Sequence, residues 1–366
     1  PIDVAAGPST EAPVAAPADK SVDIPEEHRR GRDLFTELRC ARCHPSQGNL
    51  PELAMDAPSF NNIGSRRQRD WMQRWILNPG ALRPGAHMPR LFHGDSAEAS
   101  ASAVAAFLSS LQGDPPTAAP DGDPIRGKTL FETLHCAACH DAPGTPAPNP
   151  ARIPLREVKA KFAPGALPAF LLKPERHFAW IRMPNFQLKP DEARHLAAYL
   201  DSAGETAPAA APPPAAAELE KGRILIANTG CLQCHTLQHA QSTLSAPPLS
   251  ALAAARWNSG CLAEKPDAAW KGPRFELNAG DRAALLAFGA TDRLSLSRFS
   301  AADFLKRQAD HLNCRECHGK FEGFPAWESL GGKLKPEWAG PFIAGSHRTK
   351  PRHWLEARMP SFPAYA

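Results

Sequence analysis

The sequence has no run of about 18 consecutive apolar residues, so it predicts no membrane-spanning helix. The opening residues, PIDVAAGPST, have neither a basic start nor an apolar core, so no signal peptide is visible. Such a start is expected of a mature or trimmed exported chain. The net charge is only +4, and this weak imbalance gives no reason to expect a nucleic-acid partner.

Methionine and cysteine are scarce, with five and nine copies in 366 residues, and their placement is regular. Eight of the nine cysteines fall in four copies of the pattern Cys-x-x-Cys-His, and Cys261 stands alone. A disulfide framework would not repeat one five-residue spacing four times. The four copies are Cys40-Ala-Arg-Cys43-His44, Cys136-Ala-Ala-Cys139-His140, Cys231-Leu-Gln-Cys234-His235 and Cys314-Arg-Glu-Cys317-His318.

The pattern is the attachment signal of c-type haem. Two thiols three residues apart lie on one side of a helical turn, where both can reach the vinyl groups on one haem edge, and the adjacent histidine faces the iron. A zinc site would need two copies to share one ion, and a thioredoxin-like pair would need a βαβ context that the sequence lacks. The sequence therefore predicts four covalently bound haem c groups, held by the eight cysteines and ligated by the four histidines.

Short amphipathic helices are predicted directly before three of the motifs. Gly31, Gly127 and Gly222 each stand nine residues before the first cysteine. Glycine inside a helix costs about 1 kcal/mol relative to alanine. Its repetition in one register therefore predicts that each helix packs closely against another helix. The fourth copy has Leu305 at this place instead.

A second repeated phrase, Met-Pro, follows three of the motifs. Met88, Met183 and Met359 stand 41–44 residues after a haem histidine. A thioether on the far side of the iron completes a His/Met ligand pair. The sequence therefore predicts these three methionines as distal iron ligands, whereas Met55 and Met72 lack the following proline and are predicted to be packing residues.

Helix, attachment motif and Met-Pro phrase together resemble class I cytochrome c domains, in which an N-terminal and a C-terminal helix cross at the glycine. The tandem phrasing, as in WMQRWILNPGALRPGAHMPRLF, is similar to that of multidomain c-type cytochromes of bacterial electron-transfer proteins. The resemblance implies an all-α fold of four tandem cytochrome c-like haem units, the fourth lacking a C-terminal helix. It also implies haem attachment after export, and hence a periplasmic or extracytoplasmic location.

The expected organisation follows from the motifs and the Ala/Pro tracts between them. The sequence around Ser300 and Asp303 predicts a helix cap before the fourth motif. Units one and two are expected to pack together, and likewise three and four, with the long Pro/Ala tract between the two pairs. The predicted segments are a tether at 1–24, units at 25–111, 124–203, 218–299 and 300–366, and linkers at 112–123 and 204–217.

The third unit has no distal methionine, because Gly272 stands where Met183 stands in the second. Cys261, His239, Lys271, a water molecule or nothing could replace it. Cys261 has three readings: an iron-bound thiolate, a small buried hydrophobic residue, or one half of an intermolecular disulfide.

The fourth unit also departs from the pattern, because no helical sequence follows Met359 before Ala366. We expect another unit or a partner chain to cover the side left open. Residues 281–313 are the first choice for that cover.

These features favour an electron carrier over an enzyme. The four haems would relay electrons between redox partners outside the cytoplasm, either in this chain alone or within a larger electron-transfer complex. The alternative is a haem enzyme, a sulfur-compound oxidoreductase or a peroxidase-like protein, with the third haem as active site. No further catalytic constellation is visible in the sequence.

Overall fold

The computed structural model describes residues 24–114, 121–146, 149, 151–204, 212–265, 270, 272–347 and 350–366. Regular structure in these ranges is almost entirely helical, as the sequence predicts, and the exception is a short parallel pair of β1(His140–Asp141) with β2(Ile153–Pro154). The helices are α1(Glu26–Glu37), α2(Arg69–Leu77), α3(Pro79–Leu82), α4(Ala97–Ser110), α5(Pro124–Thr133), α6(Val158–Lys161), α7(Ala166–Leu172), α8(Pro190–Ala203), α9(Ala216–Asn228), α10(Cys231–Cys234), α11(Ala279–Gly289), α12(Ala301–His311) and α13(Pro336–Ile343).

Side-chain caps fix where several of these helices begin. The Asp123 carboxylate accepts hydrogen bonds from the first backbone N–H groups of α5, and Pro124 occupies the first helical position, where no N–H is needed. Asn278 caps α11 in the same way. The Ser300 hydroxyl accepts a bond from the Asp303 N–H at 3.3 Å, so the predicted cap of α12 is confirmed.

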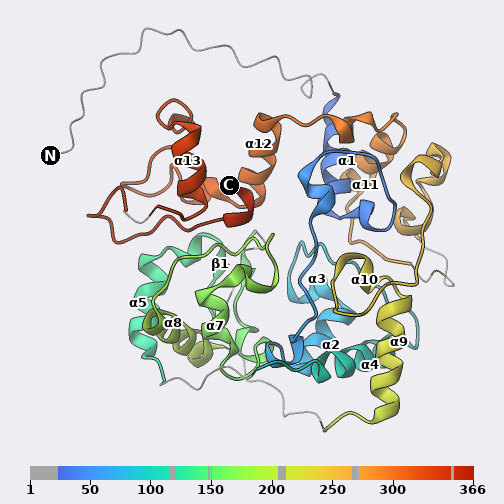
Figure 1. Cartoon of the computed structure of the whole chain (residues 1–366), viewed down its shortest axis with the longest axis horizontal. Coiled ribbons are helices and arrows are strands. Elements are labelled where there is room, and N and C mark those ends of the chain that lie inside the picture. Colours follow the sequence, from blue (N-terminus) through green and yellow to red (C-terminus); the bar gives the residue numbers. More distant parts are fainter. Residues whose placement is uncertain are drawn as a thin grey trace.

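Three pairs of helices cross in close contact: α1 with α11, α4 with α9, and α5 with α8 (Figure 1). At each crossing a glycine removes the side chain that would hold the backbones apart. The predicted role of the repeated glycine is therefore confirmed. A Cβ atom would lie 2.0 Å from the Ala284 oxygen at Gly31, 1.9 Å from the His195 oxygen at Gly127 and 2.0 Å from the Ala103 oxygen at Gly222.

The partners of two crossings were not predicted. Helix α5 crosses α8 within 124–203, but α1 crosses a helix of the third sequence unit, and α9 crosses α4 of the first. Residues 25–111 and 218–299 are therefore interlocked. The expected contact between the first and second units is present, in the Arg67–Phe162 bridge and the Arg74–Glu157 ion pair. The expected division of the chain into two pairs is wrong, because equivalent glycine faces accept equivalent partners from elsewhere in the chain, and the first unit interlocks with the third.

The hydrophobic clusters show the same exchange. One cluster joins Leu34 and Phe35 of α1 to Leu249, Trp257 and Phe288. A second joins the first unit's 60–108 region to Ile226 and Cys231. A third lies wholly within 131–200. Each cluster contains the helix that precedes one attachment motif.

The fourth unit packs on the second. Asn185 and Ser361 form an antiparallel bridge, and Arg358 pairs with Glu192. The Tyr365 hydroxyl donates to the Trp180 carbonyl at 2.8 Å. The second unit therefore covers the Met359 segment, and the expectation that residues 281–313 do so is wrong.

Helix α12, within residues 281–313, instead contacts the first unit. The Asp303 carboxylate accepts from the buried Arg32 guanidinium at 2.9 Å, and Arg307 donates to Glu52 at 2.8 Å. Leu305, which stands at the glycine register, is 55% exposed, so no helix crosses α12 at this position.

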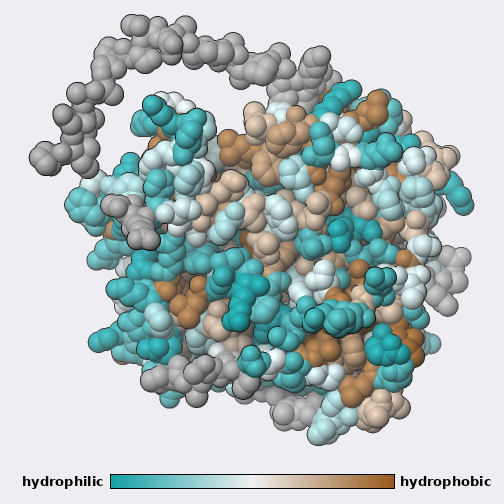
Figure 2. Space-filling model, in the orientation of Figure 1, coloured by the Kyte–Doolittle hydropathy of each residue, from teal (hydrophilic) through white to brown (hydrophobic). Residues whose placement is uncertain are grey.

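Four helical groups consequently lie around one centre (Figure 1). The first and third motifs touch through Arg42 and Gln233. Helix α2, which packs with the helix of the third motif, contacts the second unit through the Arg74–Glu157 ion pair, and the second unit contacts the fourth. The Arg32–Asp303 pair joins the fourth to the first and closes a ring. On the face shown in Figure 2, hydrophobic residues occupy several separate places among hydrophilic ones. Among the described helices, none has both the length and the apolar character needed to cross a membrane.

The interlocked helices predict the behaviour of a cut chain. A protease site engineered between Gly204 and Pro212 should yield two fragments that still elute as one particle, because α1 with α11 and α4 with α9 tie residues from both sides of the cut. Size-exclusion chromatography of the cleaved protein measures this. The same sample in denaturant should separate, and separation without denaturant would contradict the exchanged pairing.

Candidate haem sites

All four attachment motifs adopt the same local backbone. The residue before each first cysteine is left-handed, with φ of 59° at Arg39, 55° at His135, 89° at Gly230 and 57° at Asn313. A single helical turn then carries the two cysteines. In the first, third and fourth motifs the histidine N–H closes this turn on the first cysteine's carbonyl, at 2.9–3.1 Å. Both thiols and the histidine are therefore brought to one short turn, as haem attachment requires.

Each motif histidine is oriented by a backbone carbonyl, which lies within hydrogen-bond distance of its Nδ1. With Nδ1 engaged as the donor, Nε2 is the ring nitrogen left to bind iron. The partners are Pro247 for His44 at 2.8 Å, Ile153 for His140 at 3.2 Å, Pro58 for His235 at 2.7 Å and Pro325 for His318 at 3.1 Å.

The origin of these carbonyls separates the four sites into two kinds. His140 and His318 are oriented by their own sequence units. His44 is oriented by a residue of the third unit, and His235 by a residue of the first. Backbone bonds next to the histidines repeat this exchange, because the Leu249 N–H donates to the Pro45 carbonyl and the Phe60 N–H to the Thr236 carbonyl.

The motifs contact one another in two pairs. The Arg42 Nε of the first motif donates to the Gln233 carbonyl of the third at 2.9 Å. Burial raises the pKa of the Cys43 thiol to about 11, and the nearby Cys234 and Cys261 thiols act in the same direction. The thiols of motifs one and three are therefore close neighbours.

The second and fourth motifs form the other pair. The Asn313 side-chain amide lies 4.0 Å from the Cys139 sulfur. Burial, followed by the nearby Cys139 thiol, raises the pKa of the Cys317 thiol to about 11. The thiols of motifs two and four are therefore also close neighbours.

Buried cations that form no ion pair among the described residues lie beside the second motif, and their charge shows whether haem would fit there. Burial lowers the pKa of Lys161 to about 7, and Arg67 and Arg83 lower it further by charge repulsion. Burial also lowers the pKa of His140 to about 4, with Arg83 and Lys161 adding to the effect. A buried cation needs an anion, and each haem c brings two propionates. The donor set and this charge excess both fit haem c.

The predicted methionine ligands lie in different surroundings. The Met88 sulfur accepts from the Trp75 indole at 3.0 Å, and Met183 packs against the cluster that includes Phe131. Met359 is 38% exposed. Their distal-ligand roles remain predictions. Met55 and Met72 are buried, as packing residues are expected to be.

The residues that could replace the missing distal methionine of the third unit also lie in different surroundings. Cys261 is only half-buried and lies outside the three hydrophobic clusters, which does not favour a core role. His239 is exposed. Lys271 lies outside the described residues. The Trp270 indole occupies the space that a side chain at position 272 would need, since a Cβ on Gly272 would lie 2.2 Å from it.

The sequence did not predict the four backbone carbonyls that orient the motif histidines. A backbone carbonyl belongs to every residue type, so it leaves little mark on a sequence. The prolines at three of the four positions were a weak signal that could have been used.

One of these sites is the centre of a cytochrome c domain. Residues 125–204 match the family model of cytochrome c, and they contain the second motif together with the crossing of α5 and α8. This match supports a c-type cytochrome with covalently bound haem c, which is an electron-transfer protein. Neither the curated proteins nor the solved structures gave a match to the chain.

Proposed function

We propose that this chain is a tetrahaem electron carrier, in which all four motifs hold haem c and pass electrons among themselves and to redox partners. The observation that carries the proposal is the equivalence of the four motif turns. Each has a left-handed residue before the first cysteine and a carbonyl that orients the histidine. The second motif lies in the cytochrome c domain. Because the other three motifs have the same turn, we infer that they attach haem in the same way.

The paired motifs support electron transfer as the function. Contacts Arg42–Gln233 and Asn313–Cys139 bring the attachment edges of two haems together in each pair. The ring of contacts then joins the pairs. When bound, haem supplies one-electron chemistry, and the chain's residues fix its position, exclude water and set its potential through the axial ligands.

We place the protein outside the cytoplasm, as part of the same proposal, because haem is attached after export in the family that the sequence resembles. Protein partners have a candidate surface before the fourth motif. Leu294, Phe299 and Leu305 are 58%, 48% and 55% exposed, although they are large and apolar. Exposed apolar side chains gathered in one stretch favour docking to another protein.

A haem enzyme is the second candidate, since one distal segment has Gly272 instead of methionine. A haem without a methionine ligand can bind a small molecule at iron. Among the described residues, no group of three or more His, Cys, Asp or Glu side chains offers a further metal site. Optical spectra with carbon monoxide, peroxide or thiosulfate distinguish the candidates, because a pure carrier should not change on adding them.

The haem count tests the proposal. The exported protein should be heavier than its polypeptide by four haem groups in a denaturing mass spectrum. Replacing Cys136 and Cys139 by alanine should remove one haem, because no other cysteine can take over their thioether bonds. The matched control is Cys261→Ala, which should keep all four. Fewer than four haems in the unaltered chain would overturn the proposal.

A further inference from the structure

The interlocking of the first and third units decides which methionine can reach which iron. The histidine-orienting carbonyl and the distal methionine belong to one continuous segment in the second unit, where Met183 follows Ile153 by 30 residues. Met88 follows Pro58 by the same 30 residues. The Pro58 carbonyl, however, orients His235 and not His44.

Packing around Met88 agrees with this assignment. Met88 lies against the cluster that contains Ile226 and Cys231, which come directly before and within the third motif. The helix that follows Met88 is α4, and it crosses α9, the helix of the third motif. In the second unit the same relation holds between Met183, α8 and α5.

The first motif has the complementary surroundings. Its helix α1 crosses α11, and the residues before α11 include Gly272 at the place of a methionine. Arg90 and Arg274, each two residues beyond these distal positions, pair as an antiparallel bridge. The two distal segments therefore lie side by side, and each leads into the helix that belongs to the other unit's motif.

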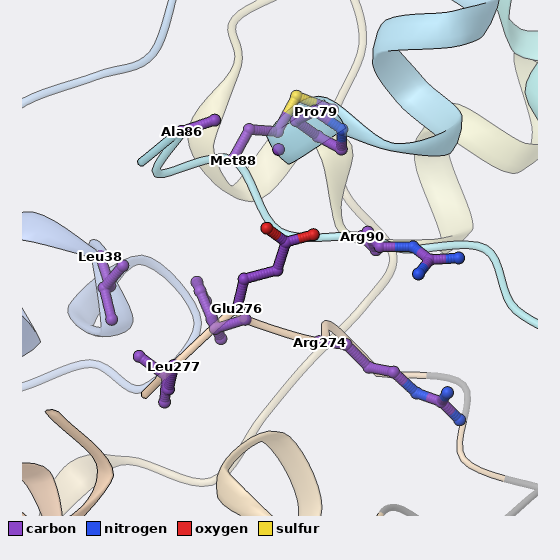
Figure 3. Close-up of a pocket in the computed structure, with 10 residues that line it drawn as sticks. Leu38, Pro79, Ala86, Met88, Arg90, Arg274, Glu276 and Leu277 are labelled. Carbon is purple, nitrogen blue, oxygen red and sulfur yellow. The ribbon is translucent and has the colours of Figure 1, made fainter. Parts of the chain in front are cut away.

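A close-up of this boundary shows the arrangement (Figure 3). Met88 lines a small cavity with residues 274–277 and with Leu38, which comes before the first motif. In this view the Met88 sulfur is drawn next to Pro79, away from the Leu38 side chain.

We infer that the first and third haem sites exchange their distal segments, so that Met88 ligates the iron beside His235 and no methionine reaches the iron beside His44. This assignment rests on the proposed function, since it needs haem at both motifs. It moves the electronically distinct haem from the third motif to the first. Cys261 then belongs to the first haem site, because it lies in the segment that leads into α11, and α11 crosses α1.

Removing one haem at a time tests the exchange. The ferrous unaltered protein should give three shifted methyl signals of iron-bound methionine in its proton NMR spectrum. A variant with Cys40 and Cys43 replaced by alanine should keep all three signals, although it has lost a haem. The matched variant with Cys231 and Cys234 replaced should keep only two.

The opposite pattern, two signals in the first variant and three in the second, would overturn the exchange. A different result would contradict the proposed function itself: a haem count other than four in the unaltered protein, measured before any variant is made. Such a count would overturn both.

A measurement without haem loss covers the case in which either variant does not fold. Met88→Ala identifies the Met88 methyl signal by its disappearance, with four haems retained. In the unaltered protein the haem bearing that methionine should give cross-peaks to Ile226 or Leu232. Cross-peaks to Leu34 or Phe35 would place Met88 on the first haem and reject the exchange.

Discussion

Replacing Gly222 by valine should separate α9 from α4 and lower the stability of the protein by about 3 kcal/mol or more, the upper range for overpacking a tight contact. The new Cβ would lie 2.0 Å from the Ala103 oxygen and 2.7 Å from the Phe107 Cβ. Because the first of these is a backbone atom, no side-chain rotation relieves the clash. The thermal unfolding midpoint measures the loss.

Hydrogen exchange on the Gly222→Val variant tells which helix loses its partner. Protection should fall in α4 and α9 and persist in α11. The control is Gly331→Val, since a Cβ on Gly331 meets nothing within 4 Å, and it should leave the midpoint unchanged. Loss of protection in α11 with an intact α4 would contradict the pairing described above.

Replacing Arg32 by methionine should cost about 3–5 kcal/mol, the usual cost of removing one partner of a buried ion pair. Arg32 has no exposed side-chain area, and it donates to Asp33 at 2.8 Å and to Asp303 at 2.9 Å. Methionine fills part of the space but leaves both carboxylates without this cation. The fourth unit should loosen first, because Asp303 lies in α12.

The acid dependence of this variant has a definite sign. Burial already raises the pKa of Asp33 above its usual value, and the Arg32 charge opposes that rise. Without Arg32 the folded-state pKa should rise further, so the folded variant gains stability relative to the unfolded chain as the pH falls through that range. The difference in free energy of unfolding between this variant and the unaltered protein should therefore become smaller as the pH falls from about 7 to about 4.

The control for this variant is Arg223→Met, which removes a cation from a fully solvated pair with Glu220 on α9. It should leave the unfolding midpoint unchanged at both pH values. A deficit in Arg32→Met that stays constant or widens on acidification would show that its cost is a packing defect and not an unpaired carboxylate.

Much of the local structure of this protein could be predicted from its sequence. The glycine register predicted where helices cross, and Ser300 predicted the start of α12, because both effects act over a few ångströms and have a residue signature. About half of the described residues are helical and almost none are in strands, as the patterning indicated. Residues 125–204 also match the cytochrome c family, as the resemblance implied.

The choice of partner was not visible in the sequence. Helices α1, α5 and α9 carry glycine at one register, so each offers the same face to any of the three helices that follow a distal segment. What distinguishes the partners are side-chain contacts between distant residues, such as the Arg30–Asp281 and Arg69–Glu218 ion pairs. Such pairs cannot be selected from one sequence, since many charges could combine. The methionine ligands and the four-haem count remain predictions.

The crossing of α1 with α11 also sets the order in which the chain can fold. Arg30 and Asp281, which meet at this crossing, are 251 positions apart in the sequence. When the chain emerges with its N-terminus first, α5 can find α8 early, but α1 has no partner until most of the polypeptide has followed. Closing such a long loop is slow. The turn that carries the first attachment motif is therefore expected to become ordered later than that of the second, and α1 is among the last helices to find its partner.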